Sequence, residues 1–180
     1  MKIQRKQGKK MEDIKVLINQ SRLEKRIGEI AKQIDKDYKG KEIVLVGVLK
    51  GSVMFMAELA KQIKNNVELD FMEVSSYEGK ESTGRVKINK DLRNPIEGKE
   101  VIIVEDILDT GRTLTYLIKY LKEKKPNSIK IATMLAKPTK KIFELDVEYI
   151  GFSIEDKFVV GYGLDHNEKY RNLPYIGYME

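Results

Sequence analysis

Two runs of consecutive apolar residues dominate the hydrophobic pattern of the chain. They are Ile-Val-Leu-Val-Gly-Val-Leu at 43–49 and Val-Ile-Ile-Val at 101–104. Continuous β-branched runs of this kind are typical of parallel strands that are buried on both faces. Each run is followed by a segment whose apolar residues recur at helical spacing, at 52–63 and at 113–124. This alternation predicts βαβ units and an α/β fold with an open, mostly parallel sheet.

The segments around these runs extend the same pattern. Apolar residues at helical spacing predict a helix over 21–38, with Ser21 as its N-cap, Glu24 as the capping-box partner and Gly40 at its end. A polar, glycine-containing stretch at 75–84 predicts a mobile loop. Further strands are predicted at 67–77, 85–90, 128–135 and 147–154.

Ligands of open parallel sheets bind beyond the carboxyl ends of the strands. The strand exits are therefore the candidate sites. They are Lys50-Gly51, Glu105 to Thr113, Lys137 and the tail that begins at Lys157.

Composition limits the class of protein. The 180 residues include 41% hydrophobic and 34% charged residues and no cysteine, which indicates one globular domain and excludes disulfides, zinc thiolate sites and cysteine nucleophiles. No apolar run approaches the ~20 residues that span a bilayer, so we expect a cytoplasmic protein. The net charge of +6 favours anionic partners, either phosphorylated small molecules or nucleic acid. We expect residues 1–10 to be a disordered leader or tag, and 11–180 to form the single domain.

The exit of the strand at 101–104 has the composition of a phosphate and ribose site. Three acids, Glu105, Asp106 and Asp109, precede Thr110–Thr113 at the start of a helix. A helix N-terminus offers unpaired N–H groups to an anion, and the glycine of the turn lets the backbone approach a phosphate. The carboxylates suit ribose hydroxyls or Mg²⁺. The acids could instead merely stabilise the helix through its dipole. The turn has little role in apolar packing, however, which favours a binding function.

Two other phosphate-binding motifs are absent. A Walker loop requires Gly-Lys-Ser or Gly-Lys-Thr, whereas the Gly-Lys pairs at 40, 79 and 98 are each followed by Glu. The nearest dinucleotide fingerprint is at 161–163, but His166 stands at the position of the third glycine. Readings as a P-loop NTPase or a dehydrogenase therefore fail.

The whole segment 101–113, Val-Ile-Ile-Val-Glu-Asp-Ile-Leu-Asp-Thr-Gly-Arg-Thr, resembles the phosphoribosyl pyrophosphate motif of the type I phosphoribosyltransferases, in the form of the hypoxanthine-guanine branch. The resemblance extends from about Asp13 to the C-terminus. It implies a mostly parallel twisted sheet flanked by helices, with a small hood formed by the N- and C-terminal segments. It also implies Mg²⁺-dependent transfer of phosphoribosyl to N9 of hypoxanthine and guanine in purine salvage, by a homodimer or homotetramer with neither membrane nor nucleic-acid partners.

The resemblance assigns residues to the phosphoribosyl pyrophosphate side of the site. Ser76 and Tyr77 correspond to a flexible lid over the reaction centre, although the same loop would otherwise be an ordinary hairpin connection. The peptide bond before Lys50 is cis in the family. The residues implied to bind phosphoribosyl pyrophosphate or pyrophosphate are Lys50, Gly51, Glu105, Asp106, Asp109, Thr110, Gly111, Arg112, Thr113 and Arg171.

The base side follows from the same resemblance. Lys137 corresponds to a lysine that donates to the exocyclic oxygen at C6 of the purine, which favours 6-oxopurines over adenine. Phe158 would stack on the base, although a lone Phe more often lies in a core. The Val159 backbone would read the edge of the base, and Asp165 would contact both the base and a second metal. The implied metal-binding residues are Glu105, Asp106 and Asp165.

Asp109 is implied to be the catalytic base that accepts the proton from N7 of the purine. Ala136 departs from the family, since many bacterial relatives carry Asp before the lysine, which puts the support of Lys137 in doubt. His166 has no clear family role, and we expect it at the surface.

Two other functions remain open from the sequence. A nucleic-acid-binding regulator on the same fold would fit the positive charge, but fewer than ~45 residues precede the first core strand, too few for a typical added domain. A pyrimidine- or xanthine-preferring transferase would differ only in the base pocket. The preference among hypoxanthine, guanine and xanthine is not set by the sequence.

Overall fold

The computed structural model describes residues 14–76, 86–140 and 145–179. The expected leader at 1–10, Tyr77 and most of the expected loop at 75–84 lie outside the described residues. Within the described part, no helix is long and apolar enough to cross a membrane.

A six-stranded sheet forms the centre of the described part, in the order β4-β3-β2-β5-β6-β7. All neighbouring strands are parallel except β3 and β4, which are antiparallel. The predicted mostly parallel α/β sheet is therefore confirmed. Its strands are β2 (Ile43–Leu49), β3 (Val67–Ser76), β4 (Val86–Lys90), β5 (Glu100–Leu108), β6 (Ser128–Ala136) and β7 (Tyr149–Ser153).

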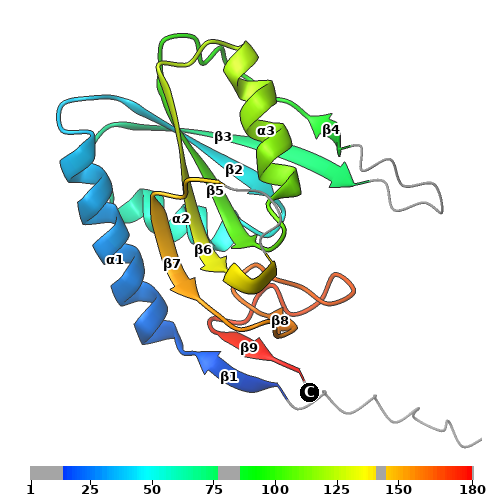
Figure 1. Ribbon diagram of the computed structural model, residues 1–180. Helices are drawn as coiled ribbons and strands as arrows, with labels where there is room; N and C mark the ends of the chain where they lie inside the picture. Colours follow the sequence, from blue (N-terminus) through cyan, green and yellow to red (C-terminus); the bar gives the residue numbers. More distant parts are fainter. Residues whose placement is uncertain (1–13, 77–85, 141–144, 180) are drawn as a thin grey trace, which may run out of the picture.

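Helices cover both faces of this sheet (Figure 1). The helices α1 (Gln20–Asp37) and α2 (Val53–Gln62) share one hydrophobic core with the sheet, and α3 (Arg112–Glu123) shares a second core on the opposite face. The buried stripe of α1 has the predicted helical spacing and consists of Leu23, Ile27, Ile30, Ala31 and Ile34. The apolar runs of β2 and β5 feed both cores, which is why they show no alternation.

The boundary between β2 and β5 is the topological switch point of the sheet. From β2 the chain passes through α2 to β3 on one side, and from β5 it passes through α3 to β6 on the other side. The two crossover helices lie on opposite faces of the sheet, and ligands of such sheets bind beyond the carboxyl ends of the strands at the switch point. The fold therefore places the candidate site beyond these two strand ends.

A second sheet has three strands in the order β1-β9-β8, all antiparallel. Figure 1 shows it beyond the arrowheads of β5, β6 and β7, built from the two ends of the chain. This arrangement is the predicted hood. Its strands are β1 (Lys15–Ile18), β8 (Val159–Val160) and β9 (Ile176–Tyr178); the residue pattern did not predict β1 as a strand.

Local details differ from the sequence predictions in two places. The helix α1 begins at Gln20, so its N-cap is Asn19 rather than Ser21, and the Asn19 Oδ1 atom accepts a hydrogen bond of 2.9 Å from the backbone N–H of Arg22. The strand β5 continues to Leu108 instead of ending at Val104, because β6 pairs with it to that point. The acids at 105 and 106 consequently belong to a strand and not to a turn.

Candidate functional site at the carboxyl ends of β2 and β5

The exit of β5 surrounds a small hollow of about 90 Å³ at the start of α3. Gly111 is the N-cap residue and has a φ of 84°, a left-handed conformation that suits glycine. It supplies no side-chain cap to the helix, and the hydroxyl of Thr110 accepts only a long hydrogen bond, 3.4 Å, from the Arg112 backbone. The N-terminus of α3 therefore offers its N–H groups to an anion in the hollow. Residues 105 and 107–114 line the hollow.

The acids at this exit are incompletely hydrogen-bonded. The buried Glu105 Oε2 and Asp109 Oδ1 atoms have no hydrogen-bond partner among the described residues. Burial, followed by the adjacent Asp106 carboxylate, raises the pKa of Glu105 well above its ordinary value. Burial also raises the pKa of Asp106 to about 6, against the opposing effect of a backbone hydrogen bond from Ile107. Buried carboxylates in such a setting are common where an external ligand completes the site.

The exit of β2 packs directly against β5. The Leu49–Lys50 peptide bond is cis, as the resemblance predicts. A Cβ atom at Gly51 would overlap the carboxylate of Asp106, so only glycine allows this close approach. The following residue, Ser52, donates its hydroxyl to the Val48 carbonyl at 2.7 Å and ties the turn back to the strand.

The tail closes over the same two exits. Gly163 has a φ of 99°, and a Cβ atom there would overlap the carbonyl oxygen of Gly51. The guanidinium of Arg171 donates to the Gly163 carbonyl at 2.7 Å and pairs with the Asp165 Oδ1 atom at 2.8 Å. Four of the sequence-predicted residues, from segments more than 50 positions apart, therefore lie together with Asp106. These four are Lys50, Gly51, Asp165 and Arg171.

Lys137 stands at the exit of β6, beside the β5 exit. Its backbone N–H donates to the Leu108 carbonyl at 2.9 Å, and the residue is only 8% exposed. Its Nζ atom lies 3.2 Å from Asp156 Oδ1, and Lys140 Nζ lies 2.9 Å from the same oxygen. An acid 19 positions later in the sequence thus supports Lys137, although Ala136 precedes it.

Phe158 is 53% exposed, although a lone Phe is more often a core residue. Its ring meets the ring of His166 edge to face, with 5.3 Å between centroids. His166 itself is half-buried, and this ring contact is a feature that the sequence did not predict. Val159 is buried in β8, whose backbone belongs to the hood sheet.

The predicted lid lies mostly outside the described residues. Ser76 is the last residue of β3, and Tyr77 is not described. Arg112 is exposed at the first turn of α3.

Three residues near the site were missed by sequence reasoning: Asp156, Lys140 and Glu168. Asp156 is two positions before Phe158, which was its one sequence signal. Charged side chains of this kind otherwise resemble ordinary surface residues in a sequence.

The carboxylates at the exit of β5 could supply some, but not all, of the ligands of a divalent metal. Within 14–76, 86–140 and 145–179, no group of three His, Cys, Asp or Glu side chains is arranged to hold a metal ion. The predicted metal-binding residues, Glu105, Asp106 and Asp165, therefore do not form one closed cage. The partnerless Glu105 oxygen does fit a hard cation whose other ligands come from substrate and water, which is the usual coordination of Mg²⁺.

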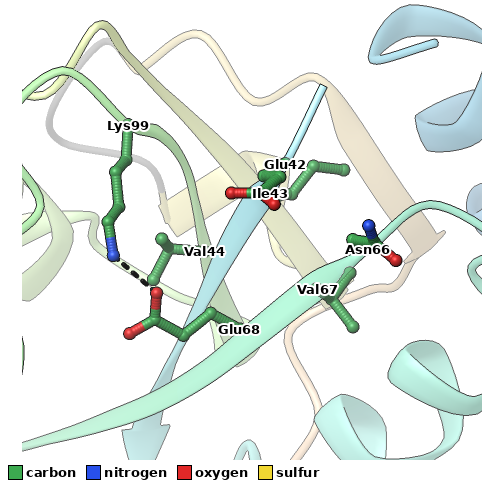
Figure 2. Close-up of a pocket in the computed structure, with 7 residues that line it drawn as sticks. All are labelled: Glu42, Ile43, Val44, Asn66, Val67, Glu68 and Lys99. Carbon is green, nitrogen blue, oxygen red and sulfur yellow. Dashed lines mark hydrogen bonds and ion pairs between the residues drawn. The ribbon is translucent and has the colours of Figure 1, made fainter. Parts of the chain in front are cut away.

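A different hollow, of about 250 Å³, lies at the opposite ends of the strands, where β2 and β3 begin (Figure 2). Its one lining ammonium, Lys99, pairs with the Glu68 Oε2 atom at 2.6 Å, and Glu42 adds a second acid. The ammonium of Lys99 is therefore already paired, and no helix begins among the residues that line this hollow. The hollow at the start of α3, in contrast, presents a helix N-terminus, which makes it the better phosphate site.

The chain is similar to known phosphoribosyltransferases over most of its length. Residues 14–167 match the family model of the phosphoribosyl transferase domain. The hypoxanthine-guanine phosphoribosyltransferase of Staphylococcus aureus is 50% identical over 163 residues, which are 90% of this chain and 91% of that protein. The bifunctional protein TilS/HprT of Listeria monocytogenes is 47% identical over 92% of this chain, but the chain spans only 26% of its length.

Solved structures show the same relationship. A hypoxanthine-guanine phosphoribosyltransferase from Bacillus anthracis, with a HEPES molecule in its active site, superposes with a TM-score of 0.90 at 47% identity and covers 93% of this chain and 100% of its own. The hypoxanthine phosphoribosyltransferase of Trypanosoma cruzi, in complex with its product IMP, gives a TM-score of 0.88 at 36% identity, over 97% of this chain and 98% of its own. The chain therefore belongs to the phosphoribosyltransferase family, within its hypoxanthine-guanine branch.

Proposed function

We propose that the protein transfers the 5-phosphoribosyl group of phosphoribosyl pyrophosphate to N9 of hypoxanthine and guanine, releasing pyrophosphate and forming IMP and GMP in purine salvage. One observation carries this proposal: the hollow at the start of α3 lies at the switch point of the sheet, and two carboxylate oxygens on its wall have no partner among the described residues. The names of the relatives support the same reaction.

The exit of β5 would hold the phosphoribosyl group. The backbone N–H groups and hydroxyls of Thr110–Thr113 would bind the 5′-phosphate at the helix N-terminus. Glu105 and Asp106 would accept hydrogen bonds from the ribose hydroxyls, which suits the free Glu105 oxygen. Lys50, the Gly51 backbone and Arg171 would bind the leaving pyrophosphate.

Asp109 would accept the proton that N7 of the purine loses as the N9–C1′ bond forms. Its Oδ1 atom has no hydrogen-bond partner among the described residues and is available for that proton. The exposed face of Phe158 would stack on the base, and the buried Lys137 ammonium would donate to the oxygen at C6. The Val159 backbone would read the edge of the base.

Mg²⁺ would be held by Glu105 and Asp106, with Asp165 at a second position. When bound, the ion would offset the negative charge of the pyrophosphate group. A dimer or tetramer in the cytoplasm is also proposed, on the strength of the resemblance alone.

The direct test uses the purified protein with phosphoribosyl pyrophosphate, Mg²⁺ and one base at a time: hypoxanthine, guanine, xanthine, adenine or uracil. We expect nucleoside 5′-monophosphate and pyrophosphate with hypoxanthine and guanine, and little product with adenine, whose amino group cannot accept a hydrogen bond from Lys137. Absence of turnover with every 6-oxopurine, together with salt-dependent binding of RNA or DNA, would replace the proposal with that of a nucleic-acid-binding regulator.

A further inference from the structure

Glu168 lies between the two cations that the proposed function gives to pyrophosphate. Its Oε2 atom is 2.8 Å from Lys50 Nζ, and its Oε1 atom is 3.1 Å from Arg171 Nη2. Lys50 comes from the β2 exit and Arg171 from the tail, so one carboxylate joins cations from two separate segments. Both oxygens of Glu168 are used in these contacts.

The backbone around Glu168 holds this carboxylate in place. Asn167 and Glu168 have φ values of 54° and 61°, and the backbone N–H of Glu168 donates to Asp165 Oδ2 at 2.9 Å. Paired backbone hydrogen bonds between His166 and Lys169, of 3.1 and 3.2 Å, close the turn. The turn therefore directs the Glu168 side chain toward the two cations.

The bridge has the chemistry of a replaceable anion. A carboxylate that joins an ammonium to a guanidinium makes the same charge-assisted hydrogen bonds that two phosphate oxygens would make. The side chains of Glu168 and Lys50 are 64% and 58% exposed, and ion pairs this exposed are weak. A more highly charged ligand can therefore displace Glu168.

Arg171 has anchors that do not depend on Glu168. Its guanidinium donates to the Gly163 carbonyl and pairs with Asp165, and neither contact involves Glu168. Displacement of Glu168 would thus free hydrogen-bonding capacity on Arg171 without releasing the guanidinium from the site.

We propose that Glu168 is an internal substitute for pyrophosphate: it neutralises Lys50 and Arg171 when the leaving group is absent, and it must move aside for phosphoribosyl pyrophosphate to bind. The inference rests on the proposed function of the two cations. No bond forms or breaks in this exchange, since Lys50 and Arg171 transfer their hydrogen bonds from the carboxylate to phosphate oxygens. Glu168 therefore lowers the affinity for pyrophosphate and favours its release.

The test is the Glu168→Gln variant, which keeps the size of the side chain and removes its charge. Calorimetry with inorganic pyrophosphate at fixed Mg²⁺ should show binding roughly 2- to 5-fold tighter than in the wild type, as expected when a weak competing ion pair is lost. The KM for phosphoribosyl pyrophosphate should fall by a similar factor, while kcat stays equal or falls because pyrophosphate leaves more slowly.

The matched control is Glu29→Gln, which removes an exposed carboxylate paired with Arg26 on α1, away from the candidate site. It should leave pyrophosphate affinity unchanged. Equal or weaker pyrophosphate binding by Glu168→Gln would overturn the inference, because a residue that only positions the two cations would weaken binding when altered. Wild-type turnover tests the proposed function separately, since the calorimetric comparison does not need turnover.

Discussion

The strand β5 has acids with buried carboxylate oxygens at or near both of its ends, and the two ends differ in how completely these oxygens are hydrogen-bonded. Glu100, at its start, accepts hydrogen bonds from Lys41 Nζ at 2.8 Å, from Asn127 Nδ2 at 2.5 Å and from the hydroxyl of Ser128. The hydrogen bond from Lys41, followed by that from Ser128, lowers the pKa of Glu100. This carboxylate is fully satisfied by the protein itself.

At the other end of β5, Glu105 and Asp109 each bury an oxygen that has no partner among the described residues, and burial raises the pKa of Glu105. A buried acceptor without a partner costs about 1–3 kcal/mol. A fold retains such a cost where something outside the protein supplies the missing donor or cation. We therefore propose that Glu100 holds the fold, whereas Glu105 and Asp109, at the other end of the strand and just beyond it, serve a ligand.

The largest expected effect is that of Asp109→Asn, at the ligand end. The amide keeps the shape of the side chain but cannot accept the purine proton, so kcat should fall by about 10²- to 10⁴-fold. The KM for phosphoribosyl pyrophosphate and the unfolding free energy should change little. Steady-state kinetics and urea denaturation measure the three quantities, and turnover near that of the wild type would remove Asp109 from the role of base.

A second variant tests whether Glu105, at the carboxyl end of β5, lowers the stability of the fold while it contributes to ligand binding. Glu105→Gln replaces a carboxyl group whose buried Oε2 atom has no partner among the described residues, so we expect a melting temperature equal to or above that of the wild type. Loss of charge-assisted contacts should weaken phosphoribosyl pyrophosphate binding by up to about 100-fold. If calorimetry showed unchanged affinity and thermal melting showed a clear loss of stability, Glu105 would be a structural acid like Glu100.

For Glu100→Gln, at the start of the strand, we expect the opposite result: lower stability and unchanged kinetics. Substitution disturbs three hydrogen bonds and should cost about 2 kcal/mol of unfolding free energy at pH 7, with kcat and KM unchanged. Because the pKa of Glu100 is lowered from its ordinary value of 4.5, its contribution is present above that pH and is lost as the pH falls through the folded-state pKa.

Urea denaturation of both proteins between pH 7 and about pH 3 checks this sign. The difference between wild type and Glu100→Gln should narrow as the solution is acidified. A difference that stays constant with pH would show that the carboxylate charge of Glu100 contributes nothing, and the contrast between the two ends of β5 would then rest on packing alone.

The contrast also explains which parts of the molecule the sequence could predict. The order of strands and helices and the phosphate hollow follow from local patterns, since the apolar run and the polar turn of β5 are contiguous. Even there the boundary was wrong: β5 ends at Leu108 because of pairing with β6, which lies about 30 residues later in the chain. Pairing between distant strands leaves no signal in a single local window.

The base side was less predictable because its parts are scattered. Lys137 came from a family resemblance, and its partner Asp156 follows from the approach of two loops that no local pattern records. Likewise, Glu168 belongs to a turn with left-handed residues at 167 and 168, neither of which is glycine. A sequence shows the charges of such residues but not which of them meet.

The same comparison can be made for two lysines, Lys137 and Lys41, whose substitution should have the smallest effects of the variants considered. Lys41 serves the satisfied acid at the start of β5, whereas Lys137, at the exit of β6, would serve the purine. Lys137→Ala should raise the KM for hypoxanthine and guanine by about 10-fold, the value of roughly one charged hydrogen bond, and leave the KM for phosphoribosyl pyrophosphate near that of the wild type. Lys41→Ala should change neither KM. If both variants raised the purine KM equally, a general loss of positive charge would account for the result. The position of Lys137 at the exit of β6 would then have no special role in purine binding.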